Sequence, residues 1–317
     1  MNISALNIII ATLFILMVCG FVCRKVKIID DTASKKMSSL ILKIGQPAMI
    51  IGSLAGAEYS DENLKSAGII VLLGFLLHLF VAVVAYFICK PIKNLDEGKI
   101  TEFSLIFTNC AFIGFPIFDA LFPENGIFLA SFYIISFNVF IWTLGIAILG
   151  RGRDDIRLTP KKALLNFGTV PCLIGFLIYM LKNPTIGFTL PEFATKSLTY
   201  LANLCTPISV LITGALIATK KPKQILTSKN LYFFCIIKLF MLPLFVCFVA
   251  KLIHLPTIYA LFSVAATALP TASTITMMSE TYGLDSGYSS LTVGMSSLLS
   301  VVTLPLVLYL AQQILLL

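Results

Sequence analysis

Charged residues are scarce in this chain. Only 12% of its 317 residues are Asp, Glu, Lys or Arg, whereas 58% are hydrophobic, and soluble domains average about 25% charged residues. Histidine occurs twice and tryptophan once. This composition excludes a soluble globular domain and indicates a protein that is integral to a membrane.

Sequence motifs of hydrolases and of ATP-driven pumps are also missing. The chain contains no His-Glu-x-x-His, Gly-x-Ser-x-Gly or Gly-x-x-x-x-Gly-Lys-Ser/Thr motif, and its eight cysteines form no Cys-x-x-Cys pair. The fifteen acidic residues lie in predicted loops or near the ends of apolar segments, with Asp119 and Glu280 closest to the interior. We therefore expect no enzyme, no metal site and no cofactor, and we interpret the cysteines as packing residues.

Apolar segments long enough for a membrane-spanning helix, about 20 residues, are abundant. Long uninterrupted apolar runs indicate an all-α membrane protein and not an outer-membrane barrel. Because the N-terminus lacks a basic region and a small-residue cleavage site, the first segment is expected to be a retained helix and not a signal peptide. We predict about ten spans: Leu6–Val22, Ser38–Gly56, Ala67–Cys89, Phe103–Phe122, Gly126–Leu149, Ala163–Leu181, Leu198–Ala218, Leu231–Ile253, Thr257–Met278 and Ser289–Leu316.

The basic residues are distributed unevenly among the predicted loops. With the N-terminus outside, inside loops 24–36, 90–99, 151–162 and 220–229 hold most of the lysines and arginines. By the positive-inside rule, this bias predicts a multi-pass protein of the cell membrane, inner or plasma, with both termini outside. It also accounts for the net charge of +8 without a nucleic-acid partner. The outside loops hold only Lys65, Lys182, Lys196 and Lys251.

The chain divides into two halves in which prolines recur at similar offsets. We predict a first five-helix repeat over residues 1–150, a short basic loop on the inside over 151–162, and a second five-helix repeat over 163–317. Because each half contains an odd number of spans, the second copy would enter the membrane from the opposite side. That arrangement is the inverted repeat found in many secondary transporters.

Prolines interrupt apolar segments at matching places in the two halves: Pro116 aligns with Pro270, and Pro47 with Pro207. A proline inside a membrane helix frees backbone groups that must face protein, water or a ligand. Paired breaks in two repeats are the best sequence pointer to a transporter's binding site. The half-helix beyond each break would present free N–H groups and a partial positive charge, which favours an anion. Pro47 and Pro207 are interpreted as kinks.

Lys43 and Lys238 are the lysines that fall within predicted spans. A charge at the centre of a membrane helix costs about 2.5–3.5 kcal/mol, so Lys238 needs a partner. That partner is either an anionic substrate or a backbone carbonyl freed by Pro243 or by the broken helix. His78 is the counterpart of Lys238 in the first half, and it would either titrate near neutral pH and couple transport to protons or pack as a hydrogen-bonded residue.

Two amide side chains lie in the predicted spans near the first break. Asn109 and Asn138 would be costly if they faced lipid. They either form hydrogen bonds between helices or line a pocket and offer donors to a ligand. Beyond the second break, Thr271, Ser273 and Thr274 add hydroxyl groups.

Several of these motifs resemble the auxin efflux carrier family, which includes plant PIN-type auxin carriers and bacterial malate or malonate permeases. The segment Asn109–Pro116 is similar to the family's Asn-x-x-x-x-Gly-x-Pro in the fourth helix, and Asn138–Trp142 is similar to the plant Gln-x-x-x-Trp of the fifth. The resemblance covers essentially the whole chain. It extends to Lys238–Pro243 in the eighth helix, Leu269–Ala272 in the ninth and Ser300–Pro305 in the tenth.

The resemblance implies ten helices in two inverted repeats, with a broken-helix crossover. Helices one, two, six and seven would form a scaffold part that dimerises, and helices three to five and eight to ten a transport part that slides past it. It also implies that Asn109 and Asn138 contact the substrate, and that Pro116 and Pro270 form the crossover. The central loop is much shorter than in many plant members, and no serine follows Pro47 directly. Both departures favour a bacterial-type permease for a small organic acid over an auxin carrier.

The sequence therefore predicts a secondary transporter of a small organic anion, a carboxylate, that works as a homodimer in the lipid bilayer by elevator-type alternating access. The alternative is a membrane sensor that binds a ligand without moving it, and the lack of an output domain counts against this. An intramembrane enzyme is disfavoured by the missing catalytic pairs. The predicted substrate-binding residues are Asn109, Asn138, Pro116, Pro270, Thr271, Ser273 and Lys238, with His78 as a proton-linked residue.

Overall fold

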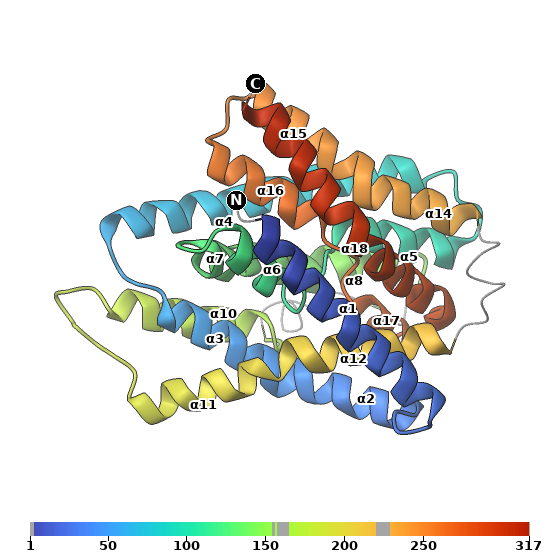
Figure 1. Ribbon diagram of the computed structural model, residues 1–317, viewed down its shortest axis with the longest axis horizontal. Coiled ribbons are helices and arrows are strands. Elements are labelled where there is room, and N and C mark those ends of the chain that lie inside the picture. Colours follow the sequence, from blue (N-terminus) through green and yellow to red (C-terminus); the bar gives the residue numbers. More distant parts are fainter. Residues whose placement is uncertain (1–2, 154–155, 157–164, 220–228, 317) are drawn as a thin grey trace.

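The computed structural model describes residues 3–153, 156, 165–219 and 229–316, which form a bundle of helices (Figure 1). Two apolar helices, Thr169–Leu181 and Thr257–Ala268, are shorter than a full span. The predicted all-α membrane class is confirmed, although fewer described segments than the ten predicted have full spanning length. Seven are long and apolar enough to cross a membrane: Ile8–Lys25, Asp31–Gly56, Asp61–Cys89, Gly126–Leu149, Glu192–Ala218, Asn230–Leu252 and Ser286–Leu316.

The described helices follow the order of the predicted spans, and three of the long ones contain a π-helical turn (η). The first half comprises α1 (Ile3–Lys25), α2 (Asp31–Leu40), η1 (Ile41–Gly45), α3 (Gln46–Gly56), α4 (Asp61–Cys89), α5 (Leu95–Ile106), α6 (Gly114–Leu121), α7 (Gly126–Phe140), η2 (Ile141–Gly145) and α8 (Ile146–Leu149). The second half comprises α10 (Thr169–Leu181), α11 (Glu192–Asn203), α12 (Cys205–Ala218), α14 (Lys229–Ile236), η3 (Ile237–Met241), α15 (Leu242–Leu252), α16 (Thr257–Ala268), α17 (Thr274–Thr281) and α18 (Ser286–Leu316).

Most of the predicted central loop, the start of the sixth predicted span at Ala163, and most of the last inside loop lie outside the described residues. The basic residues concerned are Arg157, Lys161, Lys162, Lys220, Lys221 and Lys223.

Several helices begin before the apolar segment from which they were predicted. In α5 the cause is a capping side chain. The side chain of Asn94 accepts hydrogen bonds from the first backbone N–H groups of α5, so the helix starts at Leu95 and not at the predicted Phe103. Lys99, which was predicted in a loop, and Glu102 are buried within α5. The Arg151 guanidinium forms two hydrogen bonds with the Glu102 carboxylate, at 2.8 and 3.0 Å, and this contact raises the pKa of Arg151.

Prolines lie directly after the π turns of two long helices. Pro47 is in the first turn of α3 after η1, and Pro243 is in the first turn of α15 after η3. Proline cannot donate the usual i→i−4 hydrogen bond, and a π turn is one way in which a helix accommodates that loss. Pro207 lies in the first turn of α12, after the discontinuity at Leu204 that separates α11 from α12. These positions agree with the interpretation of Pro47 and Pro207 as kinks.

Helices from the two halves pack against each other closely. α1 runs along α12, and α10 runs along α3; these helices, with α2 and α11, occupy the lower part of Figure 1. Glycines make the first contact possible. A Cβ atom at Gly20 would collide with the backbone of Leu211, and one at Gly214 with the backbone of Met17. α1 and α12 therefore touch backbone to backbone.

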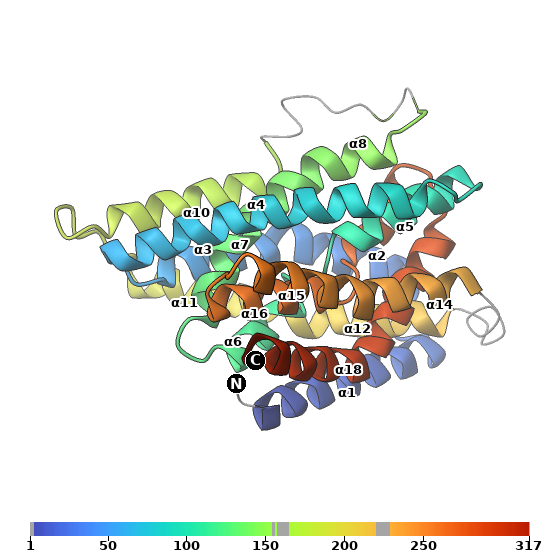
Figure 2. The ribbon, with the colours of Figure 1, turned by 90° about the horizontal axis from the view of Figure 1, so that it is seen from above.

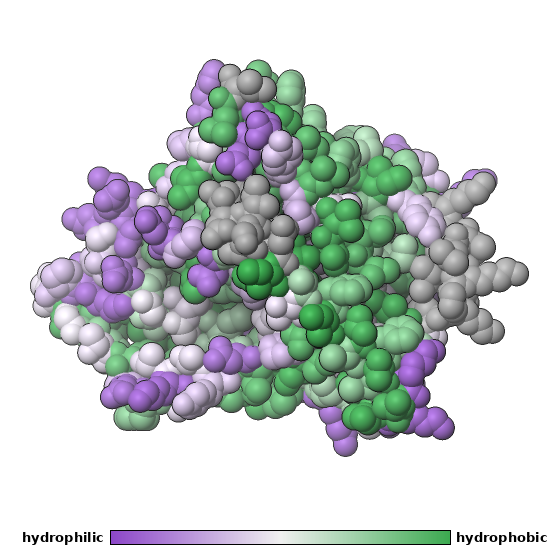
Figure 3. Space-filling model, viewed as in Figure 1, coloured by the Kyte–Doolittle hydropathy of each residue, from purple (hydrophilic) through white to green (hydrophobic). Residues whose placement is uncertain are grey.

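The surface and the chain ends agree with a membrane-embedded protein. Figure 3 shows apolar residues over the centre and right of one face, and hydrophilic clusters toward its edges. Many large apolar side chains of the long helices are exposed, including Leu72 at 60% and Phe248 at 60%. Both termini lie in the same half of the molecule in Figures 1 and 2.

Candidate functional site

The fourth and ninth predicted spans are both interrupted, and the two interruptions meet. α5 ends at Ile106 and α6 begins at Gly114, while α16 ends at Ala268 and α17 begins at Thr274. Between them, Thr108 and Thr271 form an isolated antiparallel β-bridge. We call this meeting point the crossing.

The two breaks satisfy each other's backbone groups. The N–H of Asn109 donates to the carbonyl of Pro270 at 2.7 Å, and the N–H of Ala272 donates to the carbonyl of Phe107 at 3.0 Å. Both segments are buried. Non-helical backbone at membrane depth is tolerated only where it is buried in protein or lines a cavity, and this mutual pairing meets that condition.

The two prolines of the predicted crossover occupy different places. Pro270 lies within the extended part of the second break and accepts a hydrogen bond there. Pro116 is not at the crossing: it is the third residue of α6 and is half-buried. The first break instead owes its shape to Asn109, whose carbonyl accepts from the N–H groups of Ile113 and Gly114 at 3.3 and 2.9 Å. Pro116 fits the first turn of α6 because that turn's N–H groups need no intrahelical partner.

Asn109 joins the two breaks through its side chain. Its Nδ2 donates to Ser273 Oγ at 3.4 Å, and its Oδ1 accepts from the N–H of Phe112 at 3.3 Å. Asn109 is 2% exposed, whereas Ser273 is half-exposed. Thr271 is fully buried, and its Oγ1 donates to the carbonyl of Ser104 at 3.1 Å. The structure therefore brings together four of the predicted residues: Asn109, Pro270, Thr271 and Ser273.

Lys238 also stabilises the crossing, because its side chain binds a main-chain carbonyl of α5. Its amine is fully buried and donates to the carbonyl of Leu105 at 2.6 Å. Leu105 lies in the last turn of α5, where carbonyls have no intrahelical partner and carry the negative end of the helix dipole. Of the partners considered from the sequence, the structure provides the carbonyl of the broken helix.

The hydrogen bonds of Asn138 and His78 lie outside the crossing, although the His78 ring packs against Phe107 of the first break. Asn138 Nδ2 donates to the carbonyl of Ile134 at 2.9 Å, and the side chain packs against Cys172 and Gly168 beside α10. His78 Nδ1 is 2.7 Å from the carbonyl of Gly74. Aromatic rings surround the imidazole, which is 2% exposed: Phe107, Tyr133, Phe137 and Phe140. This environment is that of a hydrogen-bonded packing residue, and the proton-linked role of His78 stays a prediction.

A polar cavity of about 430 Å³ opens beside the crossing, and we call it the α17 cavity. Ser273 and Thr274 line it where α17 begins, and no side chain caps that end of the helix. Thr276 lines it as well, and its buried Oγ1 has no hydrogen-bond partner among the described residues. The remaining lining comes from α2, η1, α12, α17 and the first break: Asp31, Ser34, Lys35, Ser38, Ser39, Ile41, Leu42, Lys43, Phe112, Ser209, Ile212, Leu216 and Met277.

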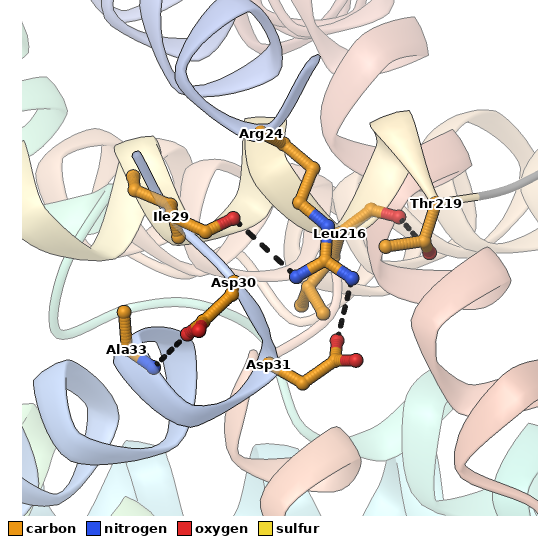
Figure 4. A network of polar contacts seen from close by, with 7 residues as sticks. All are labelled: Arg24, Ile29, Asp30, Asp31, Ala33, Leu216 and Thr219. Atoms are coloured by element: carbon orange, nitrogen blue, oxygen red, sulfur yellow. Dashed lines mark hydrogen bonds and ion pairs between the residues drawn. The ribbon is translucent and has the colours of Figure 1, made fainter. Parts of the chain in front are cut away.

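The charge of the α17 cavity is positive. Its single carboxylate, Asp31, pairs with Arg24 at 2.6 Å, and Arg24 also donates to the carbonyl of Ile29 (Figure 4). The two other charged residues of the lining are Lys35 and Lys43. An anion is therefore favoured in this cavity over a cation.

A second cavity, of about 410 Å³, is lined in part by the residues that follow the first break, and we call it the α6 cavity. Pro116 and Asp119 of α6 line it, together with Thr206 of α12 and residues of α3 and α11. Thr206 Oγ1 donates to the carbonyl of Phe112 at 2.8 Å. Because Phe112 lines the α17 cavity and Thr206 the α6 cavity, this contact lies between the two.

Lys35, Lys43 and Phe112 were not among the predicted site residues. Lys35 was assigned to an inside loop, and Lys43 to a span without a role. The available signal was the serine-rich run Ser34–Ser39 together with a lysine inside a span, since hydroxyl and amine groups facing lipid would be costly.

Comparison with known proteins places the chain among transporters. It is 27% identical to an uncharacterized transporter of Methanocaldococcus jannaschii over 68% of this chain and 70% of that protein. It is 20% identical to an uncharacterized transporter of Methanothermobacter thermautotrophicus over 94% of this chain and 95% of that protein. Residues 7–163 and 155–308 match the family described as membrane transport protein. Because these matches span most of the sequence, the chain belongs to the membrane transport protein family, as the motifs around Asn109 and Pro270 predicted.

Proposed function

We propose that this protein is a secondary transporter of a small organic anion, a carboxylate, and that it works by alternating access. The observation that carries the proposal is the crossing of two broken helices beside a positively charged polar cavity. Broken helices that meet inside a helical membrane protein are where secondary transporters bind substrate. The anion would lie in the α17 cavity near Ser273 and Thr274, with Asn109 holding Ser273 in place.

Alternating access would involve two bodies, as the family resemblance implies. The scaffold part comprises α1, α2, α3, α10, α11 and α12, and the transport part carries the crossing with α4 to α8 and α14 to α18. The α17 and α6 cavities are each lined by residues of both bodies. Sliding of the transport part would open one cavity and close the other. Dimerisation through the scaffold part remains a proposal from the resemblance.

The proposed setting is the cell membrane, with both termini outside and the basic loops inside. In that orientation the membrane potential favours anion exit by about 2.3 kcal/mol per charge per 100 mV. Export of an anion therefore needs no coupled cation, whereas uptake does.

Flux into proteoliposomes tests the proposal. A thermal-shift screen of dicarboxylates, monocarboxylates and indole acids first selects a ligand, because a bound ligand stabilises the folded state. Wild-type protein should then move that labelled ligand across the vesicle membrane. Asn109→Ala should reduce the flux by about tenfold or more, and Asn125→Ala, which removes an exposed amide at the start of α7, should leave it unchanged.

Two outcomes would count against the proposal. Saturable binding without flux in the wild-type protein would favour the sensor function. Unchanged flux in the Asn109→Ala protein would remove the crossing as the substrate site.

A further inference from the structure

Two lysines, Lys43 and Lys238, lie in π-helical turns of long apolar helices and occupy equivalent local structures. Lys43 lies in η1 and Lys238 in η3, and each π turn is followed at once by a helix with a proline in its first turn. π turns occur often at functional sites, because they disturb the regular ladder of the helix. Lys43 and Lys238 therefore share a local backbone structure, but their amines have different surroundings. This difference indicates that the two lysines have different roles.

The two lysines differ in what their amines contact. The buried amine of Lys238 holds the carbonyl of Leu105. Lys43 is exposed and lines the α17 cavity, and within the described part of the chain no carboxylate pairs with it. The ring centroid of Phe167 is 6.0 Å from Nζ of Lys43, at the outer limit of a cation–π contact.

A second part of the cavity lining also favours negative charge. α17 begins there without a side-chain cap, so its N-terminus offers N–H groups and the positive end of a helix dipole. Thr276 lines the same space, and its buried hydroxyl has no partner among the described residues. A cavity of about 430 Å³ is within the usual range for small-molecule sites.

We propose that Lys43 is the residue that selects an anion in the α17 cavity, with the carboxylate of the substrate held between its amine and the start of α17. This assignment rests on the proposed transport function and names the charge partner of its substrate. Lys43 would thus be the charge partner of an anionic substrate, a role that the sequence suggested for Lys238. The specificity it implies is for negative charge near hydroxyl groups, and not for an apolar or cationic solute.

The charge effect is measurable without knowing the substrate. A single reporter cysteine at Ser39, which lines the cavity and is half-exposed, is introduced after Cys19 and Cys23 are replaced by alanine. The other six cysteines are buried. The measurement is the ratio of modification rates by an anionic and a cationic methanethiosulfonate reagent, ethylsulfonate and ethyltrimethylammonium.

Lys43→Gln should lower the anionic-to-cationic rate ratio by about tenfold, the change expected from removing one charge a few ångströms from the reporter. Lys43→Arg should restore the wild-type ratio. Lys65→Gln should leave it unchanged, because exposed Lys65 lies in α4, away from the reporter, and does not line the cavity. Lys43→Ala serves as a second neutral variant if the glutamine variant does not fold. A ratio that neither neutral variant alters would overturn the assignment.

Transport then separates this inference from the proposed function. In proteoliposomes, Lys43→Gln should raise the KM for a carboxylate found to be transported by about tenfold, while Lys65→Gln leaves it unchanged. An altered rate ratio with no carboxylate flux in the wild-type protein would reject the proposed function but keep Lys43 as the charge of the cavity. Carboxylate flux with an unaltered KM in the Lys43→Gln protein would reject the role of Lys43 but keep the function.

Discussion

Polar side chains around the crossing direct their hydrogen bonds to the main chain. Asn109 holds the turn after the first break, Thr271 holds the carbonyl of Ser104, and Lys238 holds that of Leu105. Each bond satisfies a backbone group that the broken helices leave without an intrahelical partner. A buried group left unpaired costs about 1–3 kcal/mol, so these residues stabilise the interrupted geometry that forms one wall of the α17 cavity.

Lys238→Met tests this stabilising role at a single residue. Methionine keeps most of the side-chain volume but leaves the Leu105 carbonyl without the amine, so we expect a loss of about 1–3 kcal/mol in unfolding free energy. Lys251→Met is the matched control, because Lys251 also donates to a carbonyl, that of Ile314 at 2.7 Å, but at an exposed position. The measurement is the midpoint of thermal unfolding in detergent. Equal midpoints for the two variants would contradict the structural role of Lys238.

Single residues also show what the sequence could predict at the site. The interruption at Pro270 and the importance of Asn109 followed from local motifs. The partner of Lys238 did not, because the Leu105 carbonyl comes from a segment far away in the chain, and only the folded structure decides between a substrate and a backbone group. Lys43 could not be placed, because whether it faces lipid or a cavity depends on the path of η1.

At the level of helices, most of the bundle was predictable from apolar runs, and the errors have specific causes. α5 begins at a capping asparagine, ahead of its apolar run, and carries a buried Glu102 that pairs with the exposed Arg151, which the sequence pattern does not reveal. Two predicted spans are each divided into two short helices, and their pairing through Thr108 and Thr271 is a long-range contact that no local pattern encodes.

The contact between α1 and α12 leads to a prediction about helix packing. Gly20→Ala and Gly214→Ala would each place a Cβ against the backbone of the facing helix, so the helices must separate and lose packing. Overpacking of this kind typically costs about 1–3 kcal/mol. Gly68→Ala in α4 is the control, because a Cβ there meets nothing within 4 Å and alanine is a better helix former than glycine. The yield of monodisperse protein and the thermal midpoint measure the effect, and wild-type values for both α1–α12 variants would show that the close approach is not required.

For the whole molecule, the proposed mechanism requires contacts between the two bodies that break when they slide. The hydrogen bond from Thr206 Oγ1 of α12 to the carbonyl of Phe112 is such a contact, at 2.8 Å. Thr199 lines the same α6 cavity, but its hydroxyl bonds to Thr195 within its own helix. The hydroxyl of Thr206 therefore bonds across the two bodies, whereas that of Thr199 bonds within one of them.

Thr206→Val should shift the balance between the positions of the transport part, and Thr199→Val should not. A hydrogen bond contributes about 0.5–1.5 kcal/mol, so populations should change by about two- to tenfold. Spin labels at exposed Phe193 and Leu252 would report distances between the scaffold and transport parts, and labels at Phe193 and Ile8 distances within the scaffold part. We expect the first distance distribution to change in the Thr206→Val protein and the second to stay constant. If both stay constant in that variant and on addition of a transported anion, the two parts move as one body, and alternating access must arise from a smaller gate at Phe112.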